Sequence, residues 1–144
     1  TAIGAAGFGG LHVQVPLRAP PPPGTPWEEA APVHRSNLRA LMFSAAAPID
    51  DLAVYLHAHN LARHRFNSRA LSLTDDFLEA LPALGERLHA VWGSEDATAG
   101  GPRSLALRGE QLRQRGAGFE ILDGVGHWAM YEAAREIDAI LLRD

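Results

Sequence analysis

Residues 88–96 read Leu-His-Ala-Val-Trp-Gly-Ser-Glu-Asp, and residues 119–128 read Phe-Glu-Ile-Leu-Asp-Gly-Val-Gly-His-Trp. In both stretches a short apolar run is followed by glycine, which is the pattern of a buried strand that leads into a loop. Between them, residues 104–115 carry apolar side chains at helical spacing, and Gly116 follows as a helix-ending glycine. A last helix follows the second loop. The order strand, helix, strand, helix predicts an α/β fold with two parallel strands joined by a right-handed crossover.

The chain divides into three regions by composition. Residues 1–25 run from the end of a strand through a glycine-rich loop into a proline-rich linker. Residues 26–73 contain several helical patterns without strands, and their helix starts are a capping box at Thr25 and a second start at Asp50. Residues 74–144 begin with a short helix and then hold the predicted strands.

Composition excludes several classes of protein. The chain has 144 residues, of which 47% are hydrophobic and 21% charged, as in a globular domain. The net charge of -4 and the scattered basic residues provide no surface for nucleic acid. There are no cysteines, which excludes a disulfide framework and agrees with a cytoplasmic location. Because no apolar run approaches about 20 residues, we expect no contact with a membrane.

Two polar residues follow the predicted strands, where a parallel sheet gathers reactive groups. Asp96 lies in the loop after the first strand, and His127 lies in the loop after the second. If the strands are neighbours, the carboxylate can hydrogen-bond one imidazole nitrogen and leave the other free to take a proton from a nucleophile. Glu95 competes with Asp96 for this role, but the spacing after Trp-Gly favours Asp96.

The two loops resemble those of the α/β-hydrolase superfamily. Trp-Gly-x-x-Asp, followed after one helix and one strand by Gly-x-Gly-His, is similar to the acid and histidine loops of that family, in the family's chain order. Residues 126–132, Gly-His-Trp-Ala-Met-Tyr-Glu, look most like the meta-cleavage C–C bond hydrolases, in which a tryptophan commonly follows the histidine. The resemblance is strong over residues 81–132 and weak elsewhere.

The resemblance implies the C-terminal part of an α/β-hydrolase fold, with residues 26–73 as a helical cap. Asp96 would be the acid and His127 the base of a catalytic triad. Trp128 would contact the substrate, and so would Arg63 and Phe66 at the end of the longest cap helix. The alternative for Arg63 is a solvated helix end. We expect no cofactor and no metal.

The nucleophile of the triad is missing from the sequence. No Gly-x-Ser-x-Gly is present, and none of the serines matches a nucleophile elbow: Ser36, Ser44, Ser68, Ser72, Ser94 and Ser104. We therefore expect a truncated part of a serine-type hydrolase that cleaves a C–C bond next to a ketone, or an ester, in a small-molecule carbonyl substrate. We also expect the chain to self-associate or to pair with the missing N-terminal half, because part of the sheet is absent.

Other interpretations of the same residues remain open. The chain can be a non-catalytic binding or assembly module that retains relic triad residues, or a relative of the dehalogenases and epoxide hydrolases of the same fold. Asp96 taken alone is an ordinary helix-entry aspartate, and His127 taken alone is a structural histidine.

A metal site among the other histidines is not expected from the sequence. The candidates are His34, His57, His59 and His64. Residues two apart on a helix, such as His57 and His59, face away from one another, whereas residues three or four apart meet.

Overall fold

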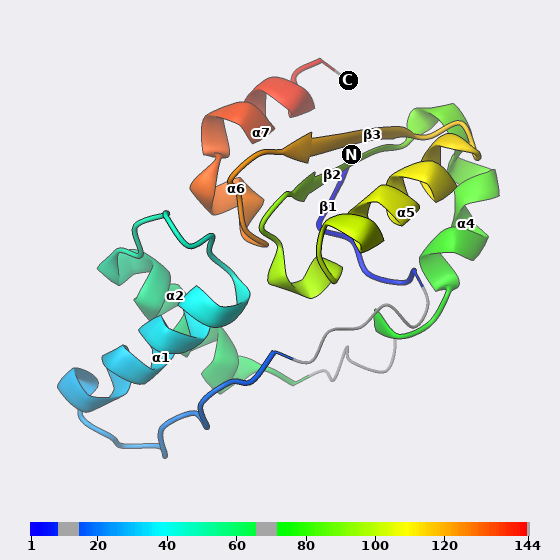
Figure 1. The fold of residues 1–144 in the computed structure, drawn as a ribbon. Coiled ribbons are helices and arrows are strands. Elements are labelled where there is room, and N and C mark those ends of the chain that lie inside the picture. The colour runs from blue at the N-terminus through cyan, green and yellow to red at the C-terminus, as the bar shows by residue number, and fades with distance from the viewer. Residues whose placement is uncertain (9–14, 66–71, 144) are drawn as a thin grey trace.

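Three short parallel strands lie at the centre of the structure, a computed structural model that describes residues 1–8, 15–65 and 72–143 (Figure 1). The strands are β1 (Ala2–Ile3), β2 (His89–Gly93) and β3 (Gly118–Leu122), in the order β1-β2-β3. The parallel pairing of the two predicted strands is confirmed. His89 lies opposite Gly118, and the register continues to Gly93 opposite Leu122.

The helices and the short 3-10 turns account for most of the remaining regular structure. They are α1 (Trp27–Leu41), α2 (Asp51–Arg63), α4 (Asp76–Leu84), η1 (Gly85–Arg87), η2 (Ala97–Ala99), α5 (Pro102–Arg113), α6 (Ala129–Glu132) and α7 (Ala134–Leu141). The chain is therefore a mixed α/β protein, as predicted.

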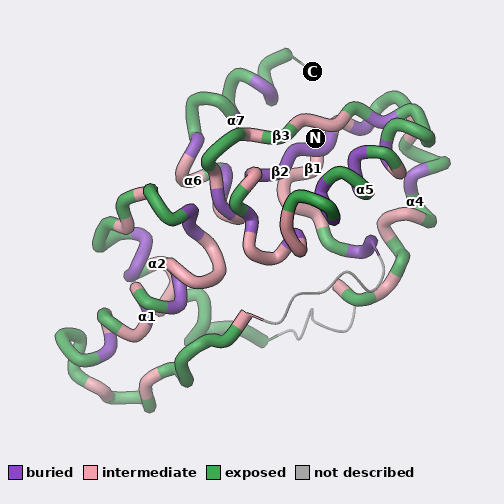
Figure 2. The backbone as a smooth tube through the Cα atoms, in the orientation of Figure 1, coloured by how far each residue is buried: buried purple, intermediate pink, exposed green. Residues whose placement is uncertain are grey.

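Helices cover both faces of the sheet. Successive side chains of a strand point to opposite faces, so alternate residues of β2 pack against different helices. On β2, Ala90 and Trp92 pack with residues of α4 and α5, whereas Val91 packs with Ile137 and Ile140 of α7. Figure 1 shows α5 below the sheet and α7 above it. Figure 2 shows that the buried segments follow the strands and the inner faces of these helices.

Helices α1 and α2, with the segment between them, form a second body, here called the helical lobe (Figure 1). Its core contains Leu38, Phe43, Ala53 and Val54, all buried. Two side chains from the region after β3, Trp128 and Tyr131, pack against this core. The helical lobe is thus joined to the loop that carries His127.

The start of α1 differs from the prediction. The capping box is wrong, because the Thr25 hydroxyl donates to the carbonyl of Pro22 at 2.8 Å and Pro26 occupies the cap position without a side-chain bond. Helix α1 also runs continuously through Pro32, where shorter helices were expected. Proline has no N–H, so the helix loses one bond near its N-terminus, and its buried face compensates for that loss.

Two other helix boundaries show where local signals succeed and fail. Asp50 caps α2 as predicted, since its carboxylate accepts the N–H of Ala53 at 2.8 Å. The last helix was expected as one element, but the chain breaks at Ala133, which has φ -125° and ψ 46°, between α6 and α7. Among the described residues, no helix combines the length and apolar character that a bilayer crossing requires.

The packing of α5 on the sheet can be tested with two leucines of that helix. Leu112 is completely buried, whereas Leu107 is 42% exposed. Leu112→Ala should lower the free energy of unfolding by about 2–5 kcal/mol, because it leaves a cavity against the sheet. Leu107→Ala should change it by less than about 0.5 kcal/mol. Denaturant unfolding of both variants measures the difference, and equal losses would contradict the packing described here.

Candidate active site

Asp96 and His127 are in direct contact where β2 and β3 end. Nδ1 of His127 lies 2.9 Å from Oδ2 of Asp96, so the expected contact is confirmed. The Asp96 side chain is fully buried, whereas the His127 side chain is 26% exposed. The pair therefore has a buried acid and a partly exposed imidazole.

Backbone hydrogen bonds between the two exit loops bring the pair together. The N–H of Ser94 donates to the carbonyl of Leu122, and the N–H of Glu95 donates to the carbonyl of Val125, both at 2.9 Å. Gly93 allows this approach, because a Cβ at that position would collide with the carbonyl oxygen of Val125. The loops therefore continue the pairing of the strands beyond the sheet.

Thr98 fixes the orientation of the Asp96 carboxylate. Oδ1 of Asp96 accepts the backbone N–H of Thr98 at 2.8 Å and its hydroxyl at 2.7 Å, which leaves Oδ2 for His127. Burial tends to raise the pKa of Asp96, but the hydrogen bond and charge of His127 and the two bonds from Thr98 outweigh it and hold the pKa below its ordinary value. Asp96 is thus kept ionised beside the imidazole.

The second ring nitrogen of His127 is Nε2. Among the described residues, none hydrogen-bonds to Nε2. The end of β1 also reaches this place, since a Cβ on Gly4 would lie 3.2 Å from Cε1 of His127 and 3.7 Å from Oδ2 of Asp96. Gly4 has a φ of +57°, which favours glycine. Three strand ends therefore meet at the pair.

Glu132 joins the loop of His127 to the helical lobe. Its carboxylate accepts the N–H of Gly126 at 3.1 Å, the N–H of Ser44 at 3.0 Å and the hydroxyl of Ser44 at 2.7 Å. The backbone N–H of Trp128 also donates to the carbonyl of Met42 at 2.9 Å. The residues on both sides of His127 are therefore held against the segment that follows α1.

Glu95 does not contact His127. Its carboxylate accepts the N–H of Ala45 at 2.9 Å and so forms another link to the helical lobe. Of these two neighbouring acids, Asp96 makes the contact with His127, as the spacing of the motif predicted.

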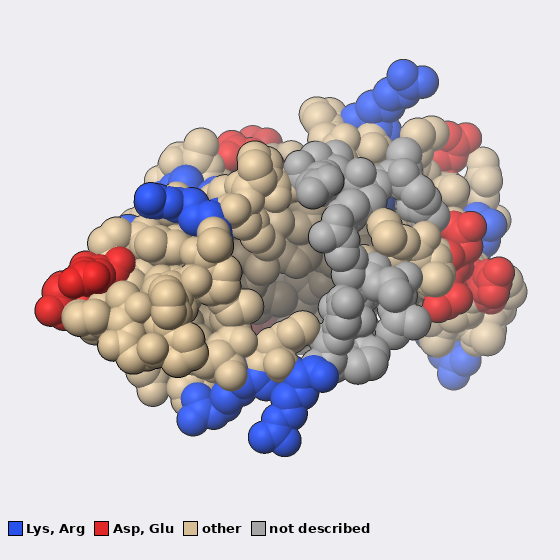
Figure 3. Space-filling view, turned by 90° about the horizontal axis from the view of Figure 1, so that it is seen from below, with Lys and Arg blue, Asp and Glu red and all other residues tan. Residues whose placement is uncertain are grey.

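The three predicted substrate-binding residues differ in where they lie. The ring of Trp128 lies 5.8 Å from that of Phe43 and 5.9 Å from that of Tyr131, and so packs in the core of the helical lobe. Arg63 is exposed at the end of α2 and contacts His59 at 2.7 Å; none of its described hydrogen bonds reaches the Asp96–His127 pair. Phe66 lies outside the described residues. The surface seen from below is hollowed beside the helical lobe (Figure 3).

The residues that support the pair were not predicted from the sequence. Thr98 follows Asp96 by two positions, the spacing of a side-chain-to-backbone turn, and this local signal could have identified it. Glu132 and Gly4 act through contacts with distant segments, for which no sequence spacing provides a rule. The chain matches no protein-family model and no curated protein at a significant level.

The role of Thr98 can be tested by removing its hydroxyl. Thr98→Val should raise the pKa of Asp96 and lower the free energy of unfolding at neutral pH by about 1–3 kcal/mol. Because the folded-state pKa is below the unfolded value of about 3.9, the carboxylate stabilises the fold above that pH, and the contribution is lost as the pH falls through the folded pKa. NMR titration of the carboxyl carbon measures the shift. Thr25→Val, at an exposed hydroxyl, should leave it unchanged.

The link through Glu132 can be tested with a glutamine. Glu132→Gln places an NH₂ group opposite one or more N–H and O–H donors, so we expect a loss of about 1–3 kcal/mol in the free energy of unfolding. The amides of Ser44 and Gly126 should shift together in NMR spectra. Glu136→Gln, an exposed position on α7, is the matched control and should change neither property. Identical behaviour of the two variants would exclude the proposed link.

Proposed function

We propose that the chain provides the acid and the base of a serine-type α/β-hydrolase that acts on a carbonyl substrate. The observation that carries this proposal is the 2.9 Å contact between Oδ2 of Asp96 and Nδ1 of His127, with Nε2 free of described partners. A buried carboxylate on one imidazole nitrogen and an accessible second nitrogen are the arrangement that general-base catalysis needs.

The strand order supports the same proposal. The acid follows β2 and the histidine follows β3, while β1 leads towards the helical lobe, which takes the position of a cap. Within the described residues, β1 pairs with β2 along one edge. The side of β1 that faces away from β2 could therefore pair with a further strand that carries the nucleophile. No Gly-x-Ser-x-Gly occurs in the sequence itself. The nucleophile is proposed to come from a segment outside these 144 residues.

The proposed chemistry follows from the two ends of the imidazole. Nε2 of His127 takes the proton of the serine hydroxyl as its oxygen attacks the substrate carbonyl carbon. Asp96, bound to Nδ1–H, stabilises the imidazolium that forms. The imidazolium then gives the proton to the leaving group, which is a carbanion equivalent in C–C cleavage and an alkoxide in ester hydrolysis. The Gly-His-Trp sequence favours C–C cleavage next to a ketone, and ester hydrolysis is the second choice.

The decisive test compares this chain with a longer form of the protein that contains a Gly-x-Ser-x-Gly segment. The 144-residue chain should show no hydrolysis of aryl esters or ring-cleavage diketones above background, because a base without a nucleophile and an oxyanion hole has nothing to activate. The longer form should hydrolyse one of these substrates. His127→Ala should lower its kcat/KM by roughly 10³-fold or more, because triad members act as a unit.

Matched variants separate the triad from general effects of charge. Asp96→Asn should lower the rate by about 10²-fold or more by favouring the wrong imidazole tautomer. Asp123→Asn, in the neighbouring loop, removes an exposed carboxylate that contacts Ser94 and should have little effect. A longer form that is active but indifferent to His127→Ala would overturn the proposal. An aspartate in place of the elbow serine would move the protein to the dehalogenase and epoxide hydrolase class.

A further inference from the structure

Two histidines meet at the interface of α1 and α2. His34 lies on α1 and is 7% exposed, and His57 lies on α2 and is partly buried. Their Nδ1 atoms are 3.2 Å apart, and the ring centroids are 5.2 Å apart with the planes at 68°. The sequence argument against a metal site considered residues two apart on one helix, such as His57 and His59. It does not apply to His34 and His57, which lie on different helices.

The arrangement matches two ligands of one metal ion. Imidazole nitrogens bind zinc at about 2.0–2.1 Å with tetrahedral angles, which places two such nitrogens about 3.3 Å from each other. The 3.2 Å between the two Nδ1 atoms is therefore close to the separation that a shared ion requires. In the absence of an ion, the same approach is a hydrogen bond in which one neutral ring donates to the other.

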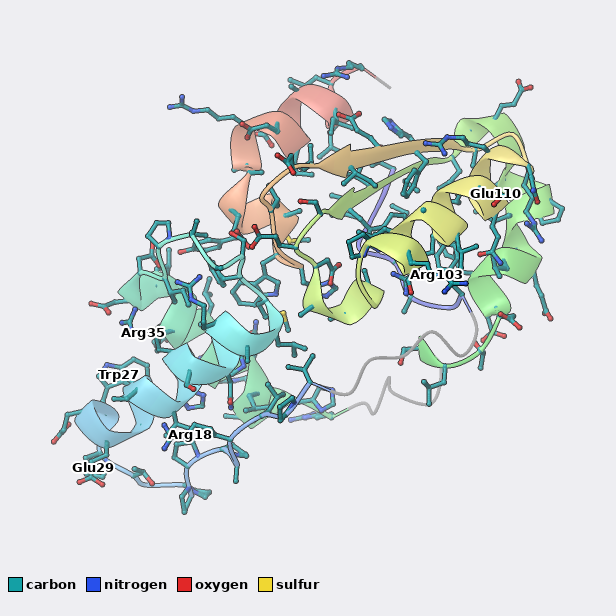
Figure 4. The ribbon with its side chains drawn as sticks, viewed as in Figure 1. Arg18, Trp27, Glu29, Arg35, Arg103 and Glu110 are labelled. Atoms are coloured by element: carbon teal, nitrogen blue, oxygen red, sulfur yellow. The ribbon has the colours of Figure 1, made fainter. Side chains whose placement is uncertain are left out.

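The surroundings keep both imidazoles in the form that binds metal. Burial lowers the pKa of both His34 and His57, which favours the neutral form of each ring, the form that can bind a metal ion. Arg35, the next residue along α1 and labelled in Figure 4, is engaged elsewhere, because its guanidinium donates to the Asp51 carboxylate at 2.6 Å. Among the described residues, no third histidine, aspartate or glutamate joins the pair. Water must complete the coordination, and His57 is accessible enough to admit it.

We propose that His34 and His57 form a two-histidine zinc site that connects α1 to α2. The ion binds both Nδ1 atoms, the ring protons reside on Nε2, and two water molecules complete a tetrahedron. With two protein ligands the affinity is modest. Zinc then stabilises the helical lobe by binding the folded state and not the unfolded one. This role is independent of hydrolysis.

The experiment is a zinc titration of the tag-free 144-residue chain followed by NMR of the histidine rings. The signals of His34 and His57 should change first and together, at a stoichiometry of one ion. His34→Ala and His57→Ala should each weaken zinc binding by tenfold or more, since losing a direct ligand should cost at least as much as losing an outer-shell partner, about 10–100-fold. His59→Ala, on the same helix, should leave the affinity unchanged.

A second readout removes any dependence on how well the variants fold. Zinc should raise the thermal midpoint of the unmodified chain, and chelation should reverse this shift. The pH series has a definite sign: affinity should hold below the ordinary histidine pKa of about 6.5 and fall at lower pH, as protons displace the ion. The proposal is overturned if zinc shifts His127 or His89 before this pair, or if the two rings keep their hydrogen bond at saturating zinc.

Discussion

The structure depends on the pairing of two loops beyond the end of the sheet. Ser94 and Glu95 donate their backbone N–H groups to Leu122 and Val125, and Gly93 is the residue that lets the chains come so close. Strand pairing alone would place the two loops at the same edge of the sheet without determining the relative positions of their side chains. The added hydrogen bonds convert neighbouring strands into a defined contact between a carboxylate and an imidazole, and this contact contributes to the lowered pKa of Asp96.

The helical lobe is part of this construction. Glu132 collects three donors, two of them from Ser44, and Glu95 binds Ala45, so the segment after α1 is attached to the loops on both sides of the pair. Such links are charge-assisted and stronger than neutral hydrogen bonds. The imidazole is therefore held from the sheet side by Asp96 and from the lobe side through its flanking residues. If His127 is the general base proposed above, preorganisation of this kind reduces the reorientation that it must undergo.

The sequence predicted what local patterns and chain topology control. Short apolar runs before glycine gave the parallel strands, and their order predicted the contact between Asp96 and His127. It failed where tertiary packing overrides local preference: α1 continues through Pro32 because its inner face is buried in the lobe, and Thr25 bonds Pro22 and leaves the helix uncapped. Partners brought together from separate helices, such as His34 and His57, cannot be found from the spacing within either helix.

The position of β1 has a consequence for the order of folding. Ala2 and Ile3 pair with β2 only after the whole helical lobe and α4 have been traversed, and Ser44 meets Glu132 across a separation of 88 residues. Closing such long loops is entropically costly and slow, whereas β2, α5 and β3 are neighbours in the chain. The β2-α5-β3 unit is thus expected to assemble early and the two-residue strand to dock late. Because Gly4 packs against His127, we expect the Asp96–His127 pair to reach its final environment in the last steps of folding.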